Sequence, residues 1–312
     1  MHRRRTRLGG DLRSCLIRLG GAFMIEPTTV EFAGGNGVRL AADRWLPRTD
    51  VRGTILLLHG GGQTRHAWRH TAEWLAGEGW LTVSLDARGH GDSEWSNDYS
   101  LDAFVDDLHL VIGTLDAPPV LIGASLGGRT AIVAEGERGG VAAALVLVDI
   151  VPTINRAGQR RVQEFLGSAP TGFASLDEAA EAIDAYQSVP RRRRNVEGLR
   201  KNLRQRDDGR WYWHWDPRFL EFGADPRNSD TDRLIRAATN VSVPTLLVRG
   251  RHSELVTAES ASEFVDLVPG AELVVVEAGH MVTGDDNDVF TGRLNQFLSD
   301  RVRSRGCGAE GD

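Results

Sequence analysis

The sequence predicts an α/β protein, built on an eight-stranded, mostly parallel, doubly wound sheet with an inserted, mainly helical cap. From Val38 onward, short apolar runs alternate with longer amphipathic stretches, which is typical of parallel strands buried on both faces by helices. This rhythm stops between Pro152 and Asn240 and resumes at Val243. A chain of 312 residues, 41% of them hydrophobic, is long enough to bury the core of such a domain.

The predicted strands form an edge hairpin and a buried set. Residues 28–32 and 38–45 alternate apolar and polar side chains around Gly34-Gly35-Asn36-Gly37, a pattern that favours an antiparallel hairpin. The buried strands are continuous apolar runs at residues 54–58, 81–85, 120–122, 144–150, 245–248 and 273–276. We therefore expect eight strands.

The same pattern divides the chain into segments. We expect an α/β core from residues 25–151 and 241–300, a cap at 152–240, and disordered ends at 1–24 and 301–312. The apolar stretch near the N-terminus is interrupted by Arg18 before it reaches the length of an export signal. No apolar run approaches the roughly 20 residues needed to cross a bilayer. These features predict a soluble, cytoplasmic protein with no membrane partner.

Charge and cysteine content exclude several kinds of site. The net charge of −6 argues against nucleic acid as a partner. The two cysteines, Cys15 and Cys307, lie in opposite terminal segments and indicate neither a disulfide framework nor a metal site. His66 and His70 are spaced for one helix face, but no carboxylate or cysteine completes a metal site with them. We expect no metal and no cofactor.

The candidate nucleophile lies in a strand–turn–helix pattern. Residues 120–122 are followed by Gly123-Ala124-Ser125-Leu126-Gly127-Gly128 and then by a helix-like stretch, so the motif G-x-S-x-G falls between strand and helix. Such a tight turn leaves no space for side chains two residues before and after the nucleophile, a condition that Gly123 and Gly127 meet. On its own, the motif is also compatible with a non-catalytic serine in a tight strand–helix loop. The motifs that follow favour Ser125 as a nucleophile.

Backbone donors for an oxyanion are expected at two places. The strand at 54–58 ends in His59-Gly60-Gly61-Gly62, upstream of the nucleophile, where a second donor is required. We assign the oxyanion hole to the backbone N–H groups of Gly61 and Leu126. His59 is expected to bond its own loop, and together with Gly62 it is also a candidate for the edge of the substrate pocket.

Three motifs together resemble the α/β-hydrolase superfamily. Leu58-His59-Gly60-Gly61, Asp86-Ala87-Arg88-Gly89-His90-Gly91-Asp92-Ser93 and the Ser125 motif occur in the order and spacing seen in its members, and the resemblance covers roughly residues 28–298. It implies a serine-nucleophile branch with an inserted cap, similar to esterases and cofactor-free haloperoxidases. It also implies that Asp86 and Arg88 support the floor of the active site and are not catalytic.

The resemblance also implies the order Ser, acid, His for the catalytic triad. After the last strand, Ala278-Gly279-His280-Met281 resembles the catalytic-histidine loop of the family, which makes His280 the general base. For the acid we prefer Glu254, which follows the strand at 245–248, although aspartate is commoner there. Asp149 is the alternative, because it ends the strand at 144–148, from which some family members supply the acid.

The cap suggests where substrate binds. In an extended segment Trp211, Trp213 and Trp215 would share one face, which could line an apolar acyl pocket together with Met281. Core packing is the competing interpretation for each tryptophan. The run at residues 191–194 is entirely arginine and could attract an anion, although such runs are usually a solvated helix face.

These residues predict an enzyme that acts on a small-molecule acyl substrate. A serine nucleophile excludes the alkyl-ester chemistry of family members that use aspartate, such as epoxide hydrolases and haloalkane dehalogenases. We expect hydrolysis of a small or medium-sized carboxylic ester, lactone or thioester through an acyl-enzyme. The alternatives are a cofactor-free haloperoxidase or perhydrolase, a carbon–carbon bond hydrolase, and a non-enzymatic ligand receptor with the same fold.

Overall fold

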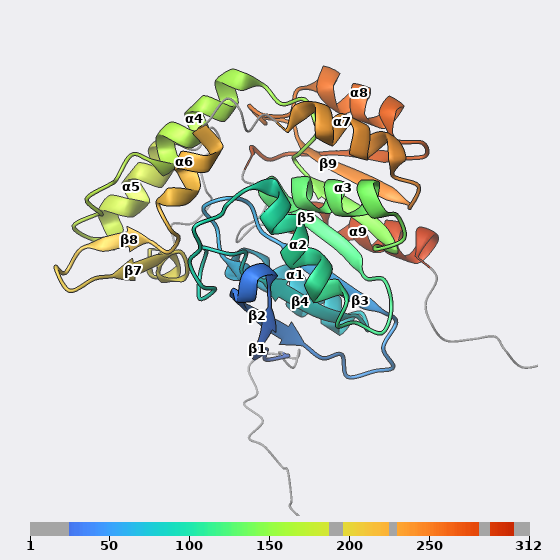
Figure 1. Ribbon diagram of the computed structural model, residues 1–312, viewed down its shortest axis with the longest axis horizontal. Helices are drawn as coiled ribbons and strands as arrows, with labels where there is room; N and C mark the ends of the chain where they lie inside the picture. Colours follow the sequence, from blue (N-terminus) through green and yellow to red (C-terminus); the bar gives the residue numbers. More distant parts are fainter. Residues whose placement is uncertain (1–24, 187–195, 225–229, 281–287, 303–312) are drawn as a thin grey trace, which may run out of the picture.

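A computed structural model describes residues 25–186, 196–224, 230–280 and 288–302. Its centre is a sheet with the strand order β1-β2-β4-β3-β5-β6-β9-β10 (Figure 1). The strands are β1 Thr28–Ala33, β2 Arg39–Trp45, β3 Thr54–Leu58, β4 Leu81–Leu85, β5 Val120–Ala124, β6 Ala144–Val148, β9 Thr245–Gly250 and β10 Glu272–Val276. β2 is antiparallel to both β1 and β4, and every other neighbouring pair is parallel. The eight predicted strands and the fold class are confirmed.

Side chains alternate between the two faces of the sheet, as the pleat of a strand requires. In β3, Leu56 and Leu58 belong to one core cluster, whereas Ile55 and Leu57 belong to the other. The first cluster is covered by α2 Leu101–Ile112, α3 Leu126–Arg138, α7 Thr231–Asn240 and α8 Ala258–Leu267. The second is covered by α1 Arg69–Gly77 and α9 Asp288–Arg301. Burial on both faces explains why the strands are continuous apolar runs.

The segment between β6 and β9 contains a group of elements that we refer to as the cap. It includes α4 Arg156–Leu166, α5 Leu176–Tyr186, β7 Leu203–Gln205, β8 Trp211–Trp213 and α6 Arg218–Ala224, which Figure 1 shows to one side of the sheet. These elements share a small apolar cluster of their own, which includes Phe173, Leu203 and Trp211. The antiparallel β7–β8 hairpin was absent from the predicted strands, because three residues per strand are too few to show a periodicity.

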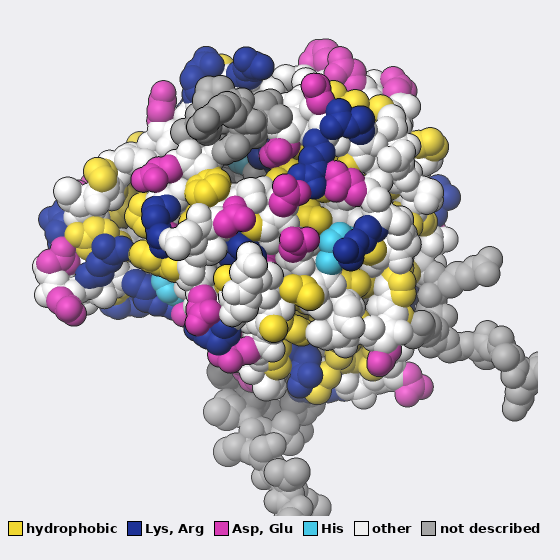
Figure 2. All heavy atoms as spheres, in the orientation of Figure 1, with side chains coloured by type: hydrophobic (Ala, Val, Ile, Leu, Met, Phe, Trp, Pro, Cys, Tyr) yellow, Lys and Arg dark blue, Asp and Glu magenta, His cyan; other side chains and the backbone are white. Residues whose placement is uncertain are grey.

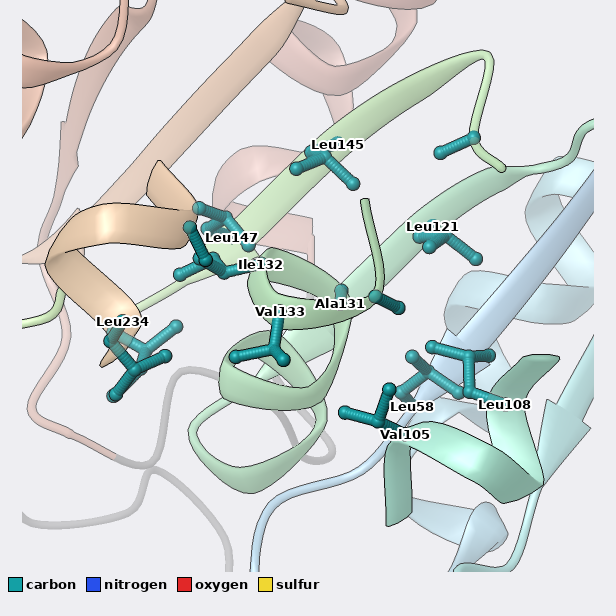
Figure 3. Close-up of a cluster of buried hydrophobic side chains, with 14 of the residues drawn as sticks. Leu58, Val105, Leu108, Leu121, Ala131, Ile132, Val133, Leu145, Leu147 and Leu234 are labelled. Carbon is teal, nitrogen blue, oxygen red and sulfur yellow. The ribbon is translucent and has the colours of Figure 1, made fainter. Parts of the chain in front are cut away.

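The helix α7 lies within the predicted 152–240 cap but packs on the core. Its Leu234 lies beside Ile132 and Val133 of α3 in the buried cluster of Figure 3. The two helices approach so closely that a Cβ atom on Gly136 would lie 2.0 Å from the carbonyl oxygen of Ala237. The boundary predicted at residue 240 is therefore too late, because α7 belongs to the helical layer on the sheet. Of the helices in the described ranges, none has both the length and the apolar character needed to span a membrane.

Candidate active site

The turn between β5 and α3 holds Ser125 in a strained backbone conformation. Its φ of 44° and ψ of −108° lie where a non-glycine residue is rarely found, at a cost of about 1–3 kcal/mol. The main chain on either side of Ser125 is closely packed. A Cβ atom on Gly123 would lie 2.6 Å from the backbone of Gly127, and one on Gly127 would lie 2.5 Å from Leu58. The glycines predicted from the motif are therefore required by close approach of the main chain.

The glycine loop after β3 lies next to this turn. Its outer N–H groups have acceptors: Gly60 donates to Gln63 Oε1 at 3.0 Å, and Gly62 donates to His90 Nε2 at 3.1 Å. Within the described parts of the chain, neither the N–H of Gly61 nor that of Leu126 donates a hydrogen bond. Both residues line the same cavity as Ser125. These two free donors have the position expected of an oxyanion hole.

Two buried histidines hold the glycine loop, and both are neutral. His59 donates from Nδ1 to the Gly60 carbonyl at 2.8 Å and accepts from Ala87 N at 3.0 Å. His90 donates from Nδ1 to the Arg88 carbonyl at 3.0 Å. A ring nitrogen that accepts a hydrogen bond carries no proton, and burial accordingly lowers the pKa of His59 to about 4 and that of His90 to about 3.

This arrangement overturns the prediction that His59 lines the pocket, and it shows that His90 also supports the glycine loop. His59 does not line the cavity, because its ring is turned into the loop, whereas Gly62 does line it. The contact of His90 with Gly62 was not predicted from the sequence. The only available signal was the position of His90 in the Asp86–Ser93 motif, since no local pattern shows which loop a side chain reaches.

The loop after β4 is a buried polar support, as the resemblance implies. Asp86 accepts hydrogen bonds from the backbone N–H of Arg65 at 2.6 Å and of Asp92 at 2.9 Å. Arg88 donates to both carboxylate oxygens of Asp107, at 2.7 and 2.6 Å. These buried charges are paired, which is the condition for stable burial. They tie the loop to the segment after β3, through Arg65, and to α2, through Asp107.

Asp149 lies against His280. The Nδ1 atom of His280 is 2.8 Å from Asp149 Oδ2, and the carboxylate is fully buried. Asp149 also accepts from the backbone N–H of Gly250 at 2.9 Å and from Ser253 Oγ at 2.5 Å. Its φ of 51° marks a second strained turn, at the end of β6. His280 is thus oriented by a buried carboxylate, with its Nε2 atom left for another partner.

Glu254, the acid preferred from the sequence, occupies a different place. Its carboxylate forms an ion pair with Arg161 of α4, and its side chain is 36% exposed. The expectation that Glu254 bonds His280 is therefore wrong, and the alternative, Asp149, has this contact. The physical reason is that β6 and β9 are neighbours in the sheet, so the ends of both strands reach the histidine loop. Only the direction of the side chains distinguishes them.

A cavity of about 710 Å³ connects these groups between the sheet and the cap. Gly61, Ser125, Leu126 and His280 line it from the core. The cap contributes α4 and a set of apolar side chains that includes Phe165, Leu166, Trp213, Phe219 and Phe222. In the ranges that the structure describes, no group of three or more His, Cys, Asp or Glu side chains is placed to hold a metal ion.

Only one of the three cap tryptophans lines the cavity. Trp213 does so, whereas Trp211 is buried in the cap cluster and Trp215 is buried beside His90, with which it forms a β-bridge. The expectation that all three share a pocket face is wrong. Trp211 packs into the cap cluster, and Trp215 is directed elsewhere because β8 ends at Trp213 and the chain turns before Trp215. Met281, also expected at the pocket, lies outside the described residues.

Comparison with known proteins identifies the family. Residues 53–286 match the family model for the alpha/beta hydrolase fold. Esterase Rv0045c of Mycobacterium tuberculosis is 31% identical over 248 residues, which cover 74% of this chain and 78% of the relative. The sn-1-specific diacylglycerol lipase ABHD11 of Mus musculus is 28% identical over 257 residues, which cover 78% and 80% of the two chains.

Solved structures agree with this match. A structure of the M. tuberculosis esterase has a TM-score of 0.65 at 26% identity and covers 88% of this chain and 92% of its own. An alpha/beta hydrolase from Novosphingobium aromaticivorans has a TM-score of 0.74 at 23% identity, covers 88% and 99% of the two chains, and shows the common fold. Since the family model spans most of the chain, this protein belongs to the α/β-hydrolase fold family.

Proposed function

We propose that this protein is a serine hydrolase of carboxylic esters, with Ser125, His280 and Asp149 as its catalytic triad. The observation that carries the proposal is the 2.8 Å hydrogen bond between His280 and buried Asp149, in the wall of the cavity that also contains Ser125. The relatives named esterase and lipase support an ester as the substrate class.

The first half of the reaction is acylation. His280 Nε2 accepts the proton of Ser125 Oγ as this oxygen attacks the ester carbonyl. The oxygen of the tetrahedral intermediate then carries a negative charge, which the N–H groups of Gly61 and Leu126 stabilise together with the positive end of the α3 dipole. His280 returns the proton to the leaving alcohol, and an ester between Ser125 and the acyl group remains.

The second half uses the same groups on water. His280 takes a proton from a water molecule that attacks the acyl-enzyme, and then returns a proton to Ser125 Oγ as the acid is released. Throughout, Asp149 holds the imidazole orientation and stabilises the imidazolium ion. The strain at Ser125 keeps its oxygen exposed at the cavity, because no ordinary turn places the side chain there.

The cavity favours a small or medium-sized acyl substrate. Its volume of about 710 Å³ lies within the range of about 300–1,000 Å³ usual for small-molecule sites. We assign the cover of this cavity to a cap that begins at residue 152 and ends before α7. The same acyl-enzyme would serve the perhydrolase and carbon–carbon hydrolase alternatives, so the acceptor and the bond cleaved must be measured directly.

The proposal is tested by covalent labelling and by two matched acid variants. A fluorophosphonate is expected to label the wild-type protein and not Ser125→Ala, and 4-nitrophenyl esters are expected to show a burst of product. Asp149→Asn should lower kcat by about 10³-fold or more, because the imidazole loses the acceptor that orients it. Glu254→Gln should lower kcat less than about threefold.

Two results would contradict this assignment. Equal labelling of the wild-type protein and Ser125→Ala would show that Ser125 is not the nucleophile. A larger loss of kcat in Glu254→Gln than in Asp149→Asn would return the role of the acid to Glu254. Product analysis in water and with added peroxide identifies the acceptor of the acyl group.

A further inference from the structure

The helix α4 presents a polar face to the cavity. Arg156, Gln159, Arg160 and Gln163 all line it, and their spacing of three and four residues places them along one side of the helix. The last turn of α4 contributes apolar side chains, Val162, Phe165 and Leu166. One end of the cavity wall is therefore polar and basic, and the other is apolar.

The described lining of the cavity has more cations than carboxylates. The cations are Arg129, Arg156, Arg160, Lys201 and Arg233, and the carboxylates are Asp102 and Asp230. Both carboxylates already have partners, since Asp230 pairs with Arg129 at 2.9 Å and Asp102 pairs with Arg233 at 2.7 Å.

Three of these cations remain without a counterion. Among the described residues, Arg156, Arg160 and Lys201 form no ion pair. The chain as a whole has a net charge of −6, and basic and acidic side chains are interspersed over the face in Figure 2. The excess of positive charge is therefore a property of the described cavity lining and does not follow from the protein's overall charge.

The position of α4 connects this polar face to the reacting groups. At one end of α4, Leu166 contacts the glycine loop after β3: a Cβ atom on Gly62 would lie 2.5 Å from the Leu166 side chain. Near the other end Gly158 packs on the loop that follows β9, where a Cβ atom would lie 2.2 Å from the Glu254 carbonyl oxygen. Arg160 and Arg156 precede Leu166 by roughly 9 and 15 Å along the helix axis, given a rise of about 1.5 Å per residue.

We infer that the cavity binds esters that carry a carboxylate remote from the scissile bond, and that Arg156 and Arg160 bind this carboxylate. This inference rests on the proposed function. Guanidinium groups bind carboxylates through paired, charge-assisted hydrogen bonds, and the amide of Gln159 supplies further donors on the same face. The apolar end of α4 then packs on the carbon chain between the two groups.

The test compares two substrates that differ only in this charge. The mono-4-nitrophenyl ester of adipic acid carries a carboxylate, and its methyl ester is the neutral counterpart. We expect the wild-type protein to have the higher kcat/KM for the anionic ester. In Arg156→Gln/Arg160→Gln the ratio of the two kcat/KM values should fall at least tenfold, and added NaCl should lower the wild-type ratio. Because both kcat/KM values scale with the concentration of active protein, their ratio is unaffected by a general loss of folded enzyme.

A matched control and a binding measurement complete the test. Arg206→Gln removes a cap arginine that lies over Tyr212 outside the cavity, and should keep the wild-type ratio. Calorimetry of adipate with Ser125→Ala measures binding without turnover, and the added Arg156→Gln/Arg160→Gln changes should weaken it at least tenfold. A wild-type ratio at or below one, or equal binding in both backgrounds, would overturn the inference. If Ser125 is not labelled, the proposed function is contradicted instead. The calorimetric result still decides whether the cavity binds a carboxylate through Arg156 and Arg160.

Discussion

At the residue scale, the Asp149 carboxylate gathers three hydrogen-bond donors in a fully buried position. Gly250 donates to one oxygen, while Ser253 and His280 both donate to the other, at 2.5 and 2.8 Å. Ser253 Oγ in turn accepts from the backbone N–H groups of Leu255 and Val256, at 3.2 and 3.0 Å. Ser253 thus links the loop after β9 to the acid, and we regard it as a positioning residue.

Ser253→Ala should lower kcat about tenfold with little change in KM, because Asp149 loses a charge-assisted hydrogen bond and holds the imidazole less firmly. Ser253→Thr keeps the hydroxyl and should restore kcat. A wild-type kcat in Ser253→Ala, or a loss that Ser253→Thr does not restore, would refute the positioning role.

At the element scale, α4 is the part of the cap that contacts the core on both sides of the site. Its Arg161 pairs with Glu254 and also donates to the Tyr186 carbonyl at 2.9 Å. Gly158 allows the helix backbone to rest on the loop after β9, next to Ser253. Glu254, which the sequence predicted to be the acid of the triad, therefore helps to hold the cap in place.

Gly158→Ala should lower the free energy of unfolding by about 1–3 kcal/mol, because the new methyl group overlaps the Glu254 carbonyl and displaces α4. It should also raise KM, since α4 lines the cavity. Gly292→Ala in α9 is the matched control: among the described residues, no atom beyond its chain neighbours and its own helix backbone lies within 4 Å of the added Cβ. That change should raise the free energy of unfolding by roughly 0.5–1 kcal/mol through helix propensity. Urea unfolding measures both, and equal signs would contradict the expected overlap.

At the scale of the whole molecule, buried neutral histidines make stability depend on pH. Burial lowers the pKa of His59 to about 4, of His90 to about 3 and of His214 to about 4. In the unfolded chain each titrates near the ordinary value of about 6.5. Below that pH the unfolded state binds more protons than the folded state, so stability is complete near pH 7 and falls as the pH approaches the folded pKa values.

Between pH 7.5 and 5, His59 and His90 should each lower the free energy of unfolding by about 2 kcal/mol. This follows because pH 5 lies about 1.5 pH units below the unfolded pKa, and each unit corresponds to about 1.4 kcal/mol. His90→Asn should therefore show a drop about 2 kcal/mol smaller than that of the wild-type protein over this range. His70→Asn, which changes a side chain that is 56% exposed, serves as the control for a His→Asn substitution at the surface. Urea unfolding at both pH values measures the difference, and an unchanged drop in His90→Asn would show that His90 protonates in the folded state.

The sequence by itself determined the features that are encoded locally. Six apolar runs and two alternating segments became the eight strands of the sheet, because such patterns depend only on the side chains of the strand itself. The tight turn at Ser125 was equally evident, since the glycines on either side of it are forced by the local backbone. The histidine loop after the last strand likewise placed His280 at the cavity.

The tertiary structure decided what depends on neighbours across the sheet and across the cap. Asp149 and Glu254 both follow strands that reach the same edge, so only the packed loops show that Asp149 turns toward His280 and Glu254 toward Arg161. Trp213 lines the cavity while Trp215 packs beside His90, because the chain bends after β8. Such choices arise from contacts between residues far apart in the chain, and no periodicity or short motif records them.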